Sequence, residues 1–341
     1  MEINTIITKP LKVPRRSSLE LLRIICMIFI VAHHFSVHGQ YGDMEMSFFN
    51  EFIKHVLGAG GKLGVNVYVL ISGYFLINSK FNVKRIIKTV LLTSFYSSII
   101  YLIIALSTPG VSLSAGEFFD SLFAIKNDEY WFVTCYVAMA ILSPFINKLI
   151  HALGEKEHII LIVVLLLMQS ALPHRDPYFN FSSTAWFITL YIIAGYLRLY
   201  PKKAFSNKRV VGILSLVLCT VLGLWSATTK MSNIVCLFTS VVLFLFFNSL
   251  NIKTNRIINL ISKTTFGIYL IHDNNYLRPI LWGKLLNCPF HASLKTFFIF
   301  SAVAVVVVFA SCSLIELLRI GVCALFKKLF EKLKTKEKKT C

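Results

Sequence analysis

The sequence predicts an all-α protein: a polytopic membrane helical bundle of about ten transmembrane helices with both termini in the cytoplasm. Of its 341 residues, 56% are hydrophobic and only 15% are charged, and the mean hydropathy is +0.70. A soluble domain would carry roughly a quarter charged residues, and a helix needs about 20 mostly apolar residues to cross lipid. Runs of that length fill most of the chain, which predicts one membrane domain and not several soluble ones.

The apolar runs are separated by polar or basic loops, which places the helices in order along the chain. Spans five and six are short and the ninth contains polar residues, so nine or eleven crossings are alternatives to ten. We predict spans at 19–38, 56–77, 86–106, 131–150, 158–172, 184–199, 210–228, 231–249, 264–282 and 296–318.

The basic residues fix the predicted orientation. The net charge is +19, but the cations lie in short clusters between apolar runs, which indicates membrane topology and not a nucleic-acid partner. With ten spans and a cytoplasmic N-terminus, 26 Lys and Arg residues fall on the cytoplasmic side and 8 on the other. A shift by one crossing would remove this bias, so both termini are predicted to be cytoplasmic.

The chain therefore divides into a cytoplasmic N-terminal segment (1–17), a transmembrane domain (18–320) and a basic cytoplasmic tail (321–341). In the tail, apolar residues recur at every fourth position between lysines. Such a pattern is typical of an amphipathic helix on anionic lipid, although a solvated tail fits it equally well.

The first span carries the residues that are hardest to explain as packing. Glu20 and Arg23 lie near its cytoplasmic end, and His33 and His34 lie deep in its other half. Charged side chains inside a span are costly and usually mark function. Arg23 and His34 are 11 residues apart, about three turns plus 20°, so both project from one face about 16 Å apart. This spacing suits a ligand along the helix, with an anionic part near Arg23 and a reactive end near His34.

A purely structural interpretation of the same residues stays open. Arg23 could pair with Glu20 three residues earlier and reach the inner headgroups. His33 and His34 could both be satisfied by polar neighbours.

The pattern Glu20-x2-Arg23-x10-His34 on a first span resembles the signature of the acyltransferase-3 family of integral membrane acyltransferases. Further similarity follows in order along residues 17–320: the segment GVNVYVLISGYFLI at 64–77, the aromatic span entries at Trp131 and Trp186, the segment GIYLIH at 267–272, and Glu316 in the last span. Asn66 stands where members often have Asp. Some members also carry an extracytoplasmic hydrolase-like domain, which we do not find in this sequence.

This resemblance implies transfer of an acyl group, commonly acetyl, from a cytoplasmic acyl-CoA to a sugar hydroxyl of a surface or lipid-linked glycan at the outer side of the membrane. It also implies an inner membrane of a bacterium as the location. The expected partners are membrane lipid, acyl-CoA as donor substrate and a glycan acceptor; we expect no permanently bound cofactor and no metal. The sequence does not define the oligomeric state, the acceptor or the acyl group.

Under this resemblance, His34 and Arg23 are the catalytic residues, and Arg23 lies near the phosphates of CoA. His34 would act as a general base on the sugar hydroxyl or as a nucleophile that carries the acyl group, and we favour the base slightly.

Six further residues are candidates for binding acyl-CoA or the acceptor, each with a structural alternative. Trp131 and Trp186 stack on a ligand or are interfacial aromatics; Ser72 donates to an oxyanion or, with Gly73, lets helices approach. His272, beside Asp273, contributes to the acceptor site or is an exposed loop residue. Glu316 is a site residue or pairs with Arg319, and Glu20 binds ligand or pairs with Arg23. The six candidates are Glu20, Ser72, Trp131, Trp186, His272 and Glu316.

The main alternative function is a transporter or flippase for a glycan or its precursor. Ten spans with intramembrane charges also describe carriers. Against it, the sequence shows no inverted repeat and no matched pair of Gly/Pro-broken helices. A receptor without chemistry has little support.

Overall fold

The computed structural model describes residues 16–42, 44–108, 113–171, 183–201, 207–226 and 233–340, and all regular structure in these ranges is helical. Of the predicted N-terminal segment, only positions 16 and 17 lie within the described residues. The helices are α1 (Ser17–His38), α2 (Phe48–Gly58), α3 (Gly60–Leu76), α4 (Val83–Ser107), α5 (Ala115–Leu122), α6 (Trp131–Ala152), α7 (Glu155–Ala171), α8 (Thr184–Leu199), α9 (Lys208–Ser226), α10 (Asn233–Ser249), α11 (Arg256–Ile261), α12 (Thr265–His272), the π-helix η2 (Pro279–Leu285), α13 (Cys288–Ala292) and α14 (Phe297–Thr340).

Six helical stretches in the described ranges are long and apolar enough to cross a membrane. They are Ser17–His38, Phe48–Leu76 (α2 and α3 together), Val83–Ser107, Trp131–Ala152, Lys208–Ser226 and Phe297–Leu329. Thr184–Leu199 and Asn233–Ser249 are apolar but shorter. The chain is thus a helical membrane protein, and the count of ten crossings stays a prediction.

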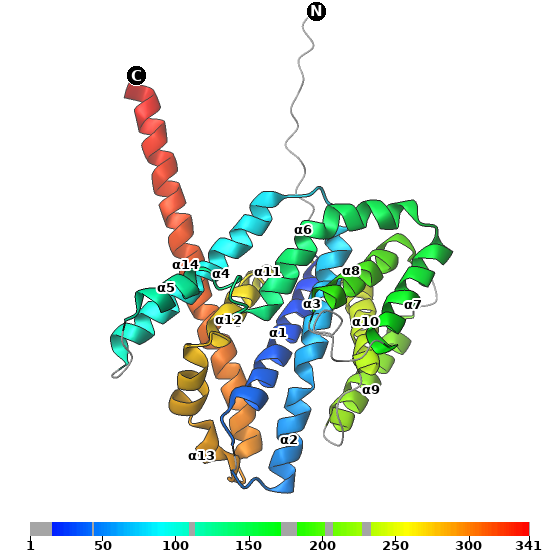
Figure 1. The fold of residues 1–341 in the computed structure, drawn as a ribbon, viewed down its shortest axis with the longest axis horizontal. Coiled ribbons are helices and arrows are strands. Elements are labelled where there is room, and N and C mark those ends of the chain that lie inside the picture. Colours follow the sequence, from blue (N-terminus) through cyan, green and yellow to red (C-terminus); the bar gives the residue numbers. More distant parts are fainter. Residues whose placement is uncertain are drawn as a thin grey trace, which may run out of the picture.

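Helix α1 runs through the middle of the bundle, with α3 on one side and α12 and α14 on the other (Figure 1). Glycines on α3 make this contact close. A Cβ on Gly64 would lie 2.8 Å from the carbonyl oxygen of Cys26, and one on Gly61 would collide with the His33 ring. The two backbones can approach because these positions carry no side chain, as in small-xxx-small membrane contacts. The approach brings the α1 histidines against α3.

A second close contact fixes α3 against α8. The Trp186 Nε1–H donates to Asn66 Oδ1 at 2.9 Å, and both side chains are buried. A Cβ on Gly73 would lie 2.8 Å from that of Ala194. Within an apolar bundle, such a buried hydrogen bond specifies how two helices are aligned.

The predicted span at 264–282 is wrong as a continuous helix. Helix α12 ends at His272, a turn follows, and η2 begins only at Pro279. The break lies at the polar run after His272, where Asn274 Oδ1 accepts from the backbone N–H groups of Tyr276 and Leu277. This side chain offers the backbone an alternative to helical hydrogen bonds, which ends the helix.

Helix α14 does not stop where the predicted basic tail begins. It runs unbroken for 44 residues, from Phe297 to Thr340, and its last turns project away from the bundle (Figure 1). At 1.5 Å per residue its length is about 66 Å, roughly twice the hydrocarbon core of a bilayer. The start of α1 and the end of α14 lie toward the same end of the bundle, as the prediction of two cytoplasmic termini requires.

Candidate active site

A small cavity lies where four helices meet in the middle of the bundle. It has a volume of about 80 Å³, and its lining comes from α1 (Met27, Ile30, His33, His34), α3 (Gly61, Lys62, Val65, Tyr68), α6 (Trp131, Phe132) and α12 (Phe266, Tyr269). Apart from the imidazoles, a lysine and two tyrosine hydroxyls, the walls are apolar or aromatic. A water molecule needs roughly 10–15 Å³ of such space, so the cavity accommodates a small group of several heavy atoms.

One stripe of α1 faces this cavity. Met27, Ile30 and His34 line it at spacings of three and four, which is one face of an α-helix. Arg23 continues the stripe one turn earlier, as the 11-residue spacing predicts. His33 also reaches the cavity, but its Nδ1–H is bound to the carbonyl oxygen of Gly58 at 2.7 Å.

His34 is held by a chain of hydrogen bonds that begins on α12. The His272 Nδ1 atom lies 2.5 Å from the carbonyl oxygen of Ile268, and its Nε2 atom lies 2.8 Å from His34 Nδ1. A carbonyl only accepts, so His272 carries its proton on Nδ1 and, in its neutral form, accepts at Nε2. The proton of neutral His34 is therefore on Nδ1, and its Nε2 atom keeps a lone pair. This nitrogen has no hydrogen-bond partner among the described residues.

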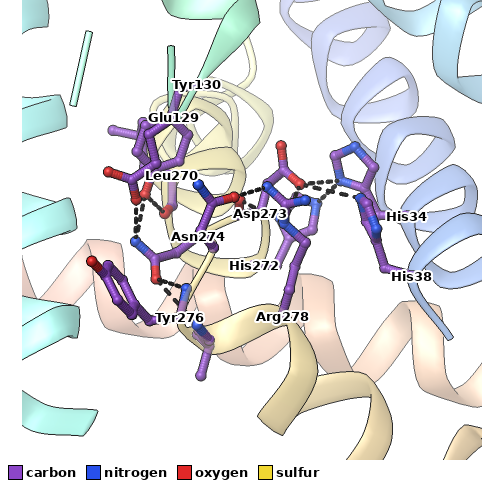
Figure 2. Close-up of polar contacts among 12 residues, drawn as sticks. His34, His38, Glu129, Tyr130, Leu270, His272, Asp273, Asn274, Tyr276 and Arg278 are labelled. Carbon is purple, nitrogen blue, oxygen red and sulfur yellow. Dashed lines mark hydrogen bonds and ion pairs between the residues drawn. The ribbon is translucent and has the colours of Figure 1, made fainter. Parts of the chain in front are cut away.

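A buried carboxylate lies beside the two imidazoles. Asp273 Oδ1 is 3.6 Å from His34 Nδ1, 3.7 Å from His38 Nε2 and 3.2 Å from Arg278 Nε. Figure 2 shows Asp273 between Arg278 and the two histidines of α1. If His34 takes a proton on Nε2, this carboxylate faces the positive charge that forms. The arrangement of a base, an orienting partner and a nearby acid follows the logic of catalytic triads.

Asn274, the residue after Asp273, connects the turn that follows α12 to the start of α6. Asn274 Nδ2 donates to Glu129 Oε1 and to Tyr130 Oη, both at 2.9 Å, on the side away from α1 (Figure 2). The Tyr130 hydroxyl in turn donates to the carbonyl oxygen of Leu270 at 2.9 Å. These contacts anchor the end of α12 from two directions and so fix where His272 and Asp273 lie.

His34, His38 and Asp273 also form the kind of group that holds a metal ion. Their ligand atoms lie within 4.8 Å of one another. However, the Arg278 guanidinium is 3.2 Å from the same Asp273 oxygen, and its positive charge opposes a second cation there. The group is therefore better described as an ion-pair network, and the expectation of no metal stays a prediction.

At the other end of α1, Arg23 and Glu20 form an ion pair. Arg23 Nη1 is 3.1 Å from both oxygens of Glu20, and the Ser262 hydroxyl donates to Glu20 Oε2 at 2.7 Å. Glu20 is buried, whereas the Arg23 side chain is 25% exposed. The structural alternative for this pair is thus present in the molecule, and a ligand role for Arg23 stays a prediction.

Two of the other predicted residues are close to His34. Trp131 lines the cavity, and Lys62 Nζ lies 5.2 Å from the centre of its ring. His272 is fully buried against His34 and is not an exposed loop residue.

The remaining three lie outside the cavity. The Ser72 hydroxyl donates to the Tyr68 carbonyl of its own helix at 2.9 Å, one turn beyond the cavity, and Trp186 is bound to Asn66. Glu316 is buried between α4 and α12: it accepts from the Tyr96 hydroxyl at 2.5 Å and from Arg319 at 2.6 and 2.7 Å.

A second, larger cavity opens between the α3–α4 turn and the C-terminal half of α6. Its volume is about 420 Å³, and its lining includes the basic residues Lys80, Arg85 and His151. Tyr136 lines this cavity and stacks on Phe132, which lines the first, with ring centres 6.1 Å apart. The two cavities therefore lie in succession along α6, separated by this aromatic pair.

The sequence alone did not identify His38, Asn274, Arg278 and Glu129, and it indicated Asp273 only as the neighbour of His272. His38 carried a usable signal, because it stands four residues after His34 on the same helix face. For Arg278 and Asn274 no signal was visible, because their partners are distant in the chain.

Taken together, the fold and the site place an unpartnered imidazole nitrogen of His34 at a partly open, largely apolar cavity within a helical membrane protein. A profile of the acyltransferase-3 family, described as an acyltransferase domain, matches residues 16–316. The chain therefore belongs to this family of membrane acyltransferases, as the motifs in the first, second and later spans predict. No curated protein and no solved structure matches it.

Proposed function

We propose that this chain is an O-acyltransferase that transfers an acetyl group from cytoplasmic acetyl-CoA to a sugar hydroxyl of a surface or lipid-linked glycan. The acceptor reacts at the outer side of the membrane, and the membrane is the cytoplasmic (inner) membrane of a bacterium. Family membership supports acyl transfer in general. The donor, the acceptor and the sidedness are the parts that we add.

The observation that carries the proposal is the lone pair of His34 Nε2 in a cavity of about 80 Å³. This nitrogen is free because His272 holds the opposite nitrogen of the ring. The cavity has room for a small acyl group such as acetyl beside this nitrogen.

In the proposed reaction, His34 acts as a general base. Its Nε2 atom takes the proton of the acceptor hydroxyl while the oxygen forms a bond to the thioester carbonyl carbon. The carbon–sulfur bond then breaks, and the CoA thiolate takes the proton back from Nε2. Asp273, 3.6 Å from Nδ1, stabilises the imidazolium between these two transfers. After both proton transfers, His34 is again neutral and ready for the next acyl transfer.

We assign the nucleotide end of CoA to the larger cavity. Lys80, Arg85 and His151 line it, and all three belong to loops or helix ends that the charge distribution predicts to be cytoplasmic. The phosphates of CoA are strong acceptors for guanidinium and ammonium groups. The pantetheine arm would then pass the Phe132–Tyr136 pair toward His34. Arg23 is one turn before Met27, which lines the smaller cavity, and its Nε and Nη2 atoms are unbound among the described residues.

The test is the ester-linked acyl content of surface glycan in cells that lack the gene. We expect the wild-type gene to restore the ester and His34→Ala, at equal abundance in the membrane, to leave it absent. The matched control is His55→Ala, which removes an exposed histidine of α2. Full restoration by His34→Ala would show that this histidine is not the base.

The same cells separate the enzyme from the alternative transporter. Loss of the enzyme leaves the glycan at the cell surface without its acyl group. Loss of a transporter or flippase leaves an unmodified glycan or precursor inside. Retention of the glycan inside, with acylation intact on what is exported, would contradict the proposed function.

A further inference from the structure

Helices α4 and α14 meet at one buried contact and then diverge. At the contact, the Tyr96 hydroxyl donates to Glu316, which packs against Gly267 of α12. Toward the start of α4 a groove of about 420 Å³ opens between the two helices. It lies on a different face of α4 from the proposed nucleotide cavity, because the two share no lining residue.

The groove is basic at one end. Lys84 and Lys88, one turn apart on α4, are both exposed and project from the same face. Arg319 of α14 lies across from them: its Nε and Nη2 atoms are bound to Glu316, and its Nη1 atom is 3.7 Å from Cys323 Sγ at the groove. The groove lining contains no Asp or Glu. An anion between the helices would therefore meet two lysines and one guanidinium edge.

The other end of the groove is apolar. Ile87, between the two lysines, begins an apolar stripe that Leu91 and Phe95 continue at every fourth position along α4; these three residues are 50%, 63% and 48% exposed. A soluble anion would leave this stripe uncovered, and an uncharged lipid would make no use of the lysines. Along the groove, a positively charged end is followed by an apolar end. This order matches a lipid phosphate headgroup followed by an acyl chain.

We propose that the groove between α4 and α14 binds an anionic phospholipid. Its phosphate lies among Lys84, Lys88 and Arg319, and one acyl chain lies on Ile87, Leu91 and Phe95. The basic end falls at the membrane surface that the charge distribution predicts to be cytoplasmic, where basic pockets between helices attract anionic headgroups. The bound lipid bridges α4 and α14 just beyond the Tyr96–Glu316 contact.

The test is binding of phosphatidylglycerol to the purified full chain, measured by native mass spectrometry without acyl-CoA or acceptor. We expect Lys84→Gln with Lys88→Gln to weaken binding about 30-fold, since each cation near an anionic headgroup contributes about fivefold. Lys84→Arg with Lys88→Arg should retain binding. The result does not depend on whether the chain transfers an acyl group.

The matched control removes two charges from the start of another membrane helix, by Lys208→Gln with Arg209→Gln on α9. Binding should change by less than twofold. Equal weakening by both pairs would reduce the effect to bulk charge and overturn the site, as would no weakening by the groove pair. The wild type provides a second test if a variant does not fold: phosphatidylcholine with the same acyl chains, bound as tightly as phosphatidylglycerol, would also overturn it.

Discussion

The two ends of α1 each hold a buried carboxylate beside a guanidinium, yet they are built in different ways. At the start of the helix, Glu20 and Arg23 are three residues apart on one helix, and Ser262 is their partner from outside. At its end, Asp273 and Arg278 come from the turn after α12, and α1 contributes imidazoles instead. The first arrangement is local in sequence and the second joins segments about 240 residues apart.

We infer from this difference that the start of α1 serves mainly stability and its end serves the proposed proton transfer. Glu20 and Arg23 neutralise each other in the ground state, so they satisfy two charges within an apolar bundle. The network around Asp273 ends instead on a nitrogen of His34 that has no partner among the described residues and faces a cavity. Only the second end offers a group that can take a proton from a ligand. Substitutions at the two ends should therefore affect different measurements.

The largest expected effect is at His34. Replacement by Gln retains a polar side chain but removes the proton acceptor, and general-base catalysis contributes about 10²–10⁴-fold. We expect acyl transfer by the purified protein to fall about 10³-fold, measured as release of CoA thiol with a glycan acceptor. The melting temperature should stay close to that of the wild type. A rate within tenfold of wild type would remove His34 from the proposed mechanism.

The next effect is at His272, which acts through His34. His272→Ala removes the acceptor for the His34 Nδ1 proton, so the ring can present the wrong nitrogen to the cavity. We expect a loss of about 100-fold in kcat with KM for acyl-CoA unchanged. His272→Gln should recover most of the rate, because its side-chain oxygen accepts the same hydrogen bond.

A purely structural role for His272 would give a different result. In that case Ala and Gln would reduce the rate in proportion to folded protein, with the same pH–rate profile as wild type. We expect instead that the profile of His272→Ala shifts, because the environment of the catalytic imidazole has changed.

A smaller effect is expected in the large cavity at the cytoplasmic side. Lys80→Gln with Arg85→Gln removes two cations from the proposed nucleotide site without reaching the His34 cavity. KM for acyl-CoA should rise about tenfold while kcat stays within twofold. Shortening the donor to an acyl-pantetheine should abolish the difference between variant and wild type. An equal difference with the short donor would place the nucleotide elsewhere.

The same contrast explains what the sequence could predict. The helical bundle, the α1 stripe and the Glu20–Arg23 pair follow from composition and from spacings of three and four, which are local rules. The break after His272 was missed because its apolar flanks concealed an Asn274 side chain that caps the turn. Asp273 and Arg278 needed the fold itself, since nothing near them in the chain indicates that they lie beside His34 and His38.

The smallest expected effect tests the start of α1. Arg23→Gln leaves the buried Glu20 carboxylate without its ion pair, and breaking such a pair is costly because one charge remains uncompensated. Since the Arg23 side chain is a quarter exposed, we expect a modest loss of stability, of about 1 kcal/mol. Adding Glu20→Gln removes the second charge, so the double variant should recover the melting temperature, measured in detergent micelles.

The double variant also distinguishes two roles of Arg23: pairing with Glu20 and binding of the acyl-CoA donor. If Arg23 only neutralises Glu20, the double variant recovers both the melting temperature and KM for acyl-CoA. If its free guanidinium nitrogens also bind the donor, stability returns while KM stays a few-fold higher, because a charge-assisted hydrogen bond is still missing. We expect the second outcome, since Arg23 continues the stripe of α1 that leads to the cavity. Recovery of both the melting temperature and KM would show that Arg23 and Glu20 only stabilise the fold, so that the residues at the other end of α1 alone take part in the reaction.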